Sequence, residues 1–163
     1  LYSSAASDVY KRQPYTEQFY IGGANSVRAF SARSIGPGGY APDKGSKYSF
    51  INHVGDIRME ANVEYRFRII GDLHGAVFLD AGNVWLMRKD DSRPGGELTL
   101  KNFAKQVALG TGAGLRYDMD FLVFRLDCGV GLHDPYDTGK SGYYNIPKFK
   151  DSLALHFAIG YPF

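Results

Sequence analysis

The residues of this sequence that are most able to do chemistry are its histidines and one serine in a glycine-rich segment. The histidines have no mutual spacing typical of metal ligands. They are His53, His74, His133 and His156. Ser141 lies in Gly139-Lys140-Ser141-Gly142, which lacks the full Gly-x-Ser-x-Gly pattern of a nucleophile elbow. The sequence therefore predicts no catalytic residue, no metal site, no cofactor and no enzyme activity.

Glycine spacing and charge exclude two further classes of site. Gly110, Gly112 and Gly114 recur at every second residue, whereas a dinucleotide-binding loop needs Gly-x-Gly-x-x-Gly before a helix. Small residues along one face of a strand are the favoured interpretation. The net charge is +2 with Lys and Arg scattered, so no nucleic-acid partner is expected. Cys128 is the single cysteine, and it leaves the redox compartment open.

The elements that must carry these residues are strands. Residues 55–70 alternate without a fault, because apolar side chains from Ile57 to Ile69 occupy one face and charged or amide side chains the other. Four more segments alternate, although the pattern is weaker in residues 73–85 because Phe78 lies on the otherwise small or polar face. The five expected strands lie near residues 55–70, 73–87, 105–118, 121–133 and 152–163.

The lengths of these strands and of their connections favour a membrane barrel. Each strand is long enough to cross a bilayer when tilted, which takes about 9 to 11 residues. Short connections at 71–72 and 118–120 alternate with long ones at roughly 87–104 and 134–151, as in outer-membrane barrels. Trp85, Tyr65, Tyr117 and Tyr161 near strand ends fit an aromatic girdle, with core packing in a soluble barrel as the alternative. Five strands cannot close a barrel, so the remaining strands are expected upstream.

The alternation fails before residue 55. Residues 14–54 are rich in Gly, Ser and Pro and are expected to form a long loop. Residues 1–13, LYSSAASDVYKRQ, resemble translated adapter sequence, and we expect them to be non-native. Residues 14–163 are expected to be the C-terminal part of the barrel.

The loop contains Val27-Arg28-Ala29-Phe30, which resembles the Val-Arg-Gly-Phe motif of the BamA/TamA family of outer-membrane assembly and translocation barrels, also called bacterial surface antigens. The resemblance continues at residues 62–66, NVEYR, and at residues 78–85, FLDAGNVW, and it covers residues 14–163 in family order. The segment GGANS before the motif and the ending GYPF are most similar to members from Bacteroidetes.

The resemblance implies an all-β fold, the five C-terminal antiparallel strands of a transmembrane barrel of about 16 strands when complete. It also implies that the loop folds into the lumen, where Arg28 meets Glu64 and Asp80, with Gly82 on the same wall. The alternation independently assigns Glu64 and Asp80 to the lumen faces. Ala29 replaces the family's glycine, so a positive φ at that position would be strained.

The same resemblance implies a function. The complete protein is expected in the bacterial outer membrane, where it would insert or translocate other proteins through a seam between its first and last strands. Its partners would be the lipid bilayer, unfolded outer-membrane clients, and periplasmic or lipoprotein subunits encoded elsewhere. The last strand would also act as its own assembly signal, through Phe157, Ile159, Gly160, Tyr161 and Phe163.

Two alternatives remain open at this point. Patatin-like phospholipases carry a similar barrel after a lipase domain, and a Gly-x-Ser-x-Gly motif upstream would identify that class. In a soluble ligand-binding barrel, the alternating apolar faces would point inward.

Overall fold

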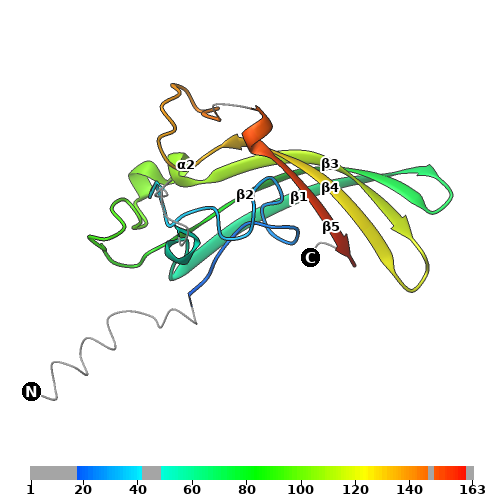
Figure 1. The fold of residues 1–163 in the computed structure, drawn as a ribbon, viewed down its shortest axis with the longest axis horizontal. Coiled ribbons are helices and arrows are strands. Elements are labelled where there is room, and N and C mark those ends of the chain that lie inside the picture. Colours follow the sequence, from blue (N-terminus) through cyan, green and yellow to red (C-terminus); the bar gives the residue numbers. More distant parts are fainter. Residues whose placement is uncertain (1–17, 42–48, 147–148, 161–163) are drawn as a thin grey trace, which may run out of the picture.

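The computed structural model describes residues 18–41, 49–146 and 149–160 and contains one antiparallel sheet (Figure 1). Each strand pairs with the next in the chain, in the order β1-β2-β3-β4-β5. The strands are β1 Ile57–Ile70, β2 Leu73–Trp85, β3 Ala108–Asp118, β4 Val123–His133 and β5 Leu153–Ile159. The expected all-β class with five antiparallel strands is confirmed.

Short helical turns interrupt the long connections. The 3-10 helix η2 (Ser49–Asn52) precedes β1, and η4 (Phe149–Ser152) leads into β5. In the β2–β3 connection, η3 (Leu100–Asn102) and α2 (Phe103–Gln106) follow one another, so β3 begins at Ala108 rather than near residue 105. Within the described ranges, no helix is long and apolar enough to cross a membrane. Residues 1–13, Tyr161 and Phe163 lie outside those ranges.

The short turns join the strands tightly. Gly71 has a φ of +51°, which the two-residue turn between β1 and β2 requires and which glycine adopts without strain. The turn between β3 and β4 places Asp120 at a φ of 57°, a conformation that aspartate tolerates better than most residues. Asp118 donates its backbone N–H to Asp72 O at 3.0 Å and so links the two turns.

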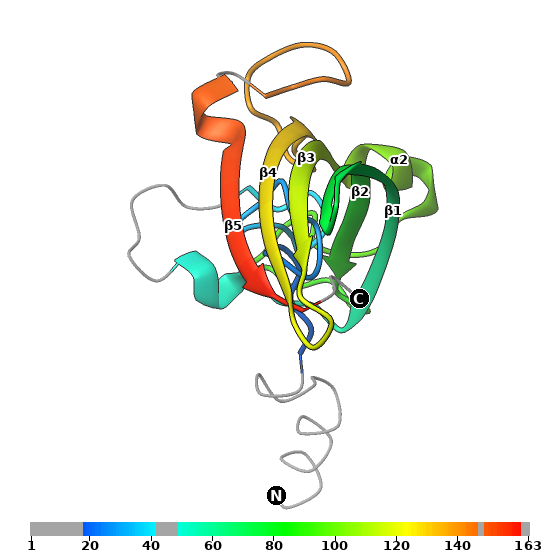
Figure 2. The same ribbon diagram turned by 90° about the vertical axis from the view of Figure 1, so that its right-hand side faces the viewer.

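The two faces of the sheet differ in polarity. On the outer face, apolar side chains are exposed along every strand, for example Val63 at 67% and Leu155 at 69%. The inner face carries buried polar groups such as Asp80 and Asp127 together with small residues such as Gly82 and Gly129. Figure 2 shows the sheet curving around residues 19–41, which lie on its inner side. The apolar core forms between this loop and the sheet, from Ile21, Val27, Ile35, Val84 and Ala108.

Trp85 corrects one expectation. Its relative exposure is 0%, its ring stacks on Phe103 with centroids 5.4 Å apart, and its Nε1 donates to Gln106 Oε1 at 3.1 Å. Trp85 is therefore a packing residue beneath α2 and not part of an exposed girdle. Tyr65 and Tyr117 are exposed on the outer face, at 67% and 48%.

Candidate functional site: the inward loop and the lumen wall

The loop before β1 reverses direction through its own backbone hydrogen bonds. Phe19 pairs with Gly55 at its base, with N···O distances of 2.8 and 2.9 Å. Gly23 donates to Phe30 O at 2.8 Å, and Phe30 donates to Val27 O at 3.1 Å. Val27 is fully buried in the core between the loop and the sheet. This compact reversal carries the neighbouring Arg28 to the inner face of the sheet.

Asp80 of β2 binds Arg28 in a bidentate manner. Arg28 Nε donates to Asp80 Oδ2 and Nη2 to Asp80 Oδ1, each at 2.8 Å. The backbone N–H of Arg28 also donates to Asp80 Oδ2, at 3.0 Å. Asn62 of β1 donates to Asp80 Oδ1 at 3.0 Å. Both charged side chains have 0% exposure and have lost their hydration, and the two parallel charge-assisted bonds offset part of that cost.

Glu64 of β1 is the second carboxylate on Arg28. It accepts a hydrogen bond from Arg28 Nη1, and its side chain is 3% exposed. The Arg28 guanidinium also lies over the ring of Phe78, with Cζ 3.7 Å from the centroid. The structure thus brings Arg28, Glu64 and Asp80 together, and the loop is attached to two adjacent strands.

The ionic network extends to β3 and β4 through residues that are not among the predicted site residues. Arg116 contacts Glu64 Oε2 through Nη2 at 3.0 Å and Asp127 Oδ1 through Nη1 at 2.6 Å. Arg125 Nε lies 3.0 Å from Asp127 Oδ2, and Nη2 returns to the loop, donating to Ala24 O at 2.6 Å. All three residues lie on predicted lumen faces, so the alternation alone could have identified them as candidates.

Glycines on the inner face make room for the loop. A Cβ on Gly129 would lie 2.6 Å from Arg28 O and 2.8 Å from Ala29 Cα, and a Cβ on Gly110 would collide with the Ala29 methyl group. Gly82 lies under Ile21 rather than against Arg28, because its Cβ would be 2.5 Å from Ile21 Cδ1. Among described non-glycine residues, only Arg33 and Asp120 have positive φ, so the strain considered for Ala29 does not arise.

The terminal strand contributes a polar contact to the loop. His156 Nε2 lies 2.8 Å from the carbonyl oxygen of Arg28, and because a carbonyl can only accept, the ring donates. Phe157 and Ile159 point away from the loop and are 67% and 60% exposed on the outer face. Gly160 has a φ of +102°. Phe157, Ile159 and Gly160 belong to the predicted assembly signal, whose other members Tyr161 and Phe163 lie outside the described residues. His156 is not part of that predicted signal.

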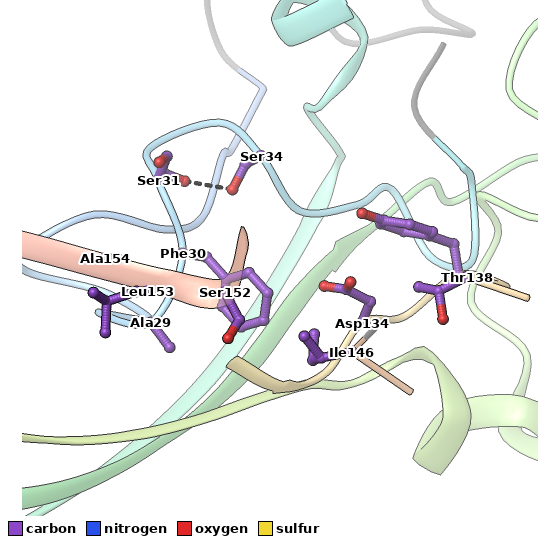
Figure 3. Close-up of a pocket in the computed structure, with 11 residues that line it drawn as sticks. Ala29, Phe30, Ser31, Ser34, Asp134, Thr138, Ile146, Ser152, Leu153 and Ala154 are labelled. Carbon is purple, nitrogen blue, oxygen red and sulfur yellow. Dashed lines mark hydrogen bonds between the residues drawn. The ribbon is translucent and has the colours of Figure 1, made fainter. Parts of the chain in front are cut away.

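A cavity of about 320 Å³ separates the loop from the beginning of β5 (Figure 3). Phe30 and Ser34 of the loop line it, together with Asp134 of the β4–β5 connection and Ala154 of β5. Burial raises the pKa of the Asp134 carboxyl. Burial, followed by the nearby charge of Asp134, raises the pKa of Tyr136 to about 12. Among the described residues, no group of three or more His, Cys, Asp or Glu side chains is placed to hold a metal ion.

The arrangement has the chemistry of a docking and positioning site. It joins the loop motif to carboxylates on β1 and β2 and to an arginine on β4. Among the contacts described above, no nucleophile is paired with a base. A family model described as the Omp85 superfamily domain matches residues 3–163. The match includes the inward loop and all five strands.

Proposed function

The chain belongs to the Omp85 superfamily, and we propose that it forms part of an outer-membrane barrel that assembles or translocates other proteins. Members of this superfamily are outer-membrane β-barrel proteins and generally act as non-enzymatic transporters or assembly factors. The finer assignment, to a BamA/TamA-like barrel of Bacteroidetes type in the bacterial outer membrane, is part of the proposal. Its clients would be unfolded outer-membrane proteins, and periplasmic or lipoprotein subunits would assist it.

The observation that carries the proposal is the buried Arg28 cluster. A fully buried arginine held by two carboxylates is rarely the least costly way to stabilise a fold, since apolar residues of similar volume often serve as well. Its value lies in fixing one conformation of the loop against β1 and β2. A loop held inside a barrel in a defined position suits a protein whose wall must open and close around it.

The seam is the second part of the proposal. β5 lies at one edge of the described sheet and pairs with β4 at seven positions, from Phe124–Ile159 to Val130–Leu153, whereas β1 and β2 pair at thirteen. An edge strand leaves the backbone donors and acceptors of its unpaired side open to an added strand. We infer that the edge of β5 is one side of a gate that templates incoming client strands, and that bilayer lipids surround the outer face.

The test exchanges the charges of the cluster in the full-length protein. Arg28→Glu faces Glu64 and Asp80 with a third negative charge, so we expect client assembly in proteoliposomes to fall at least roughly ten-fold, given about 3–5 kcal/mol for breaking a buried pair. Adding Asp80→Arg should restore part of the rate. Arg88→Glu, a charge reversal at an exposed arginine of the β2–β3 connection, is the matched control and should assemble clients normally.

Two results would contradict this function. The first is wild-type client assembly by the Arg28→Glu variant once its folding has been verified by heat-modified mobility. The second is lipase activity of the full-length protein dependent on an upstream Gly-x-Ser-x-Gly serine, which would favour the patatin-like class instead. The outward direction of the apolar side chains supports a lipid-facing barrel over a soluble ligand-binding one, and partition into membranes tests that distinction.

A further inference from the structure

His156 is a polar residue of the last strand that contacts the loop directly. The inner side of β5 carries Ala154, His156 and Ala158, so only the histidine is long and polar. Near Ala154, the cavity of Figure 3 separates the strand from the loop. Near Gly160, a second cavity of about 580 Å³ opens between the strand end and the two short turns. The hydrogen bond to Arg28 O therefore joins the strand to the loop beside the first cavity, and the second cavity lies farther along the strand at its end.

The acceptor of this bond is the residue at the centre of the ionic cluster. Arg28 fixes its backbone N–H and its side chain on Asp80, while its carbonyl accepts from His156. A displacement of the loop moves this carbonyl, and a displacement of β5 moves the donor. Gly129 of β4 lies under the same carbonyl, where a Cβ would be 2.6 Å away, so the peptide unit has little freedom to shift alone.

We propose that His156 is a positioning residue that couples the terminal strand to the Arg28 cluster, so that the edge of β5 and the inward loop move together. The coupling itself follows from the contacts, whereas its importance for a gate at the β5 edge rests on the proposed function. Loss of the bond would remove this direct attachment of β5 to the loop, while the attachments of the loop to β1, β2 and β4 remain.

The test measures backbone hydrogen exchange in β5 of the full-length protein in lipid nanodiscs. His156→Leu keeps bulk and removes the donor, and a single hydrogen bond shifts a local opening equilibrium by roughly 2- to 10-fold, so residues 153–159 should exchange faster by that factor. His156→Gln retains an N–H donor and should exchange nearly as the native protein does. His74→Leu is the matched control, because its ring contacts only Asp72 O locally among its described bonds, at 3.2 Å.

Coupling requires a second variant in the loop. Ser26 accepts a hydrogen bond from Gly22 N at 3.2 Å and donates to Glu60 of β1 at 2.7 Å, so Ser26→Ala loosens the loop without touching β5. We expect Ser26→Ala to speed exchange in β5 roughly two-fold when His156 is present. In the His156→Leu background, Ser26→Ala should leave exchange in β5 unchanged.

Two outcomes would overturn the proposal. One is equal exchange in the leucine and glutamine variants, which would assign the effect to packing of the ring. The other is an acceleration of exchange in β5 by Ser26→Ala that is as large in the His156→Leu background as in the native protein. Client assembly is measured separately on the same variants. A coupled β5 in a protein that assembles no client would refute the proposed function and leave the coupling intact.

Discussion

At the scale of single residues, the site depends as much on missing side chains as on charged ones. Arg28 reaches Asp80 only because the loop backbone lies directly on β4, and that approach needs a glycine. Gly129 has no Cβ to collide with Arg28 O, and Gly110 leaves space for the methyl group of Ala29. Close packing of this kind leaves no slack for an added methyl group.

Gly129→Ala should therefore destabilise the protein. Its Cβ would lie 2.6 to 2.9 Å from three backbone atoms of Arg28 and Ala29, and overpacking of this kind costs about 1–3 kcal/mol. Urea unfolding of the refolded full-length barrel measures the change. Gly39→Ala is the matched control, since its nearest neighbour would be Pro135 O at 3.3 Å, and its cost should be smaller. Equal costs for both variants would mean that the loop does not rest on β4 in solution.

The sequence predicts part of this site and misses the rest for a physical reason. Alternation assigns Glu64, Asp80, Arg125 and Asp127 to one face, because the side-chain period of a strand is two. Alternation cannot give the register between strands, and the register decides which of these charges lie within bonding distance. The family resemblance predicts that Arg28 contacts two carboxylates. The contact from Arg125 back to Ala24 of the loop is visible only in the structure.

At the scale of elements, the connection before β1 is anchored by His53. Its Nδ1 donates to Gly36 O at 2.6 Å, and its side chain lies buried near the ring of Tyr40. Burial lowers the pKa of His53 from the ordinary 6.5, because the charged ring would lose its hydration. The folded protein therefore holds a neutral ring at a pH where the unfolded chain already binds a proton.

This difference predicts a pH-dependent stability. Because the pKa is lowered on folding, the contribution of the neutral ring is complete above about pH 6.5 and falls as the pH decreases, by at most about 1.4 kcal/mol per pH unit. His53→Asn can keep an N–H donor and does not titrate. The free energy of unfolding of the native protein should therefore drop relative to that of His53→Asn between pH 7 and pH 5. If the free energies of unfolding of the two proteins change in parallel with pH, the pKa of His53 is not lowered by folding, and its ring is in contact with solvent.

Element boundaries also mark the limit of sequence interpretation. The tight turns at Gly71 and Asp120 follow from local chemistry and were expected. The start of β3 and the burial of Trp85 depend on α2, whose four residues are too few to give a helical period. Phe103 and Gln106 of α2 pack on Trp85. The alternation within β2 does not predict this packing, because the packing residues belong to another element.

At the scale of the whole molecule, the two faces of the sheet suit opposite environments, one polar and one apolar. The inner face buries charges that a bilayer would reject, and it pairs them with opposite charges in the network of Arg28, Arg116 and Arg125. The outer face exposes apolar side chains over all five strands, which water would disfavour at this extent. Both observations fit a wall that separates lipid from a polar interior.

A charge placed on the outer face tests this orientation. Leu155 is 69% exposed and pairs with Cys128 at the middle of β4, so in a membrane it would lie near the bilayer midplane. Leu155→Arg should then cost about 2–4 kcal/mol in the full-length protein folded into lipid vesicles.

Leu100, which is 88% exposed in η3 outside the strands, provides the matched control. Leu100→Arg should change stability by less than about 0.5 kcal/mol, as surface substitutions usually do. Denaturant titration in vesicles compares the two variants. If Leu155→Arg costs no more than Leu100→Arg, water rather than lipid covers the outer face, and the soluble barrel becomes the better description of this fold.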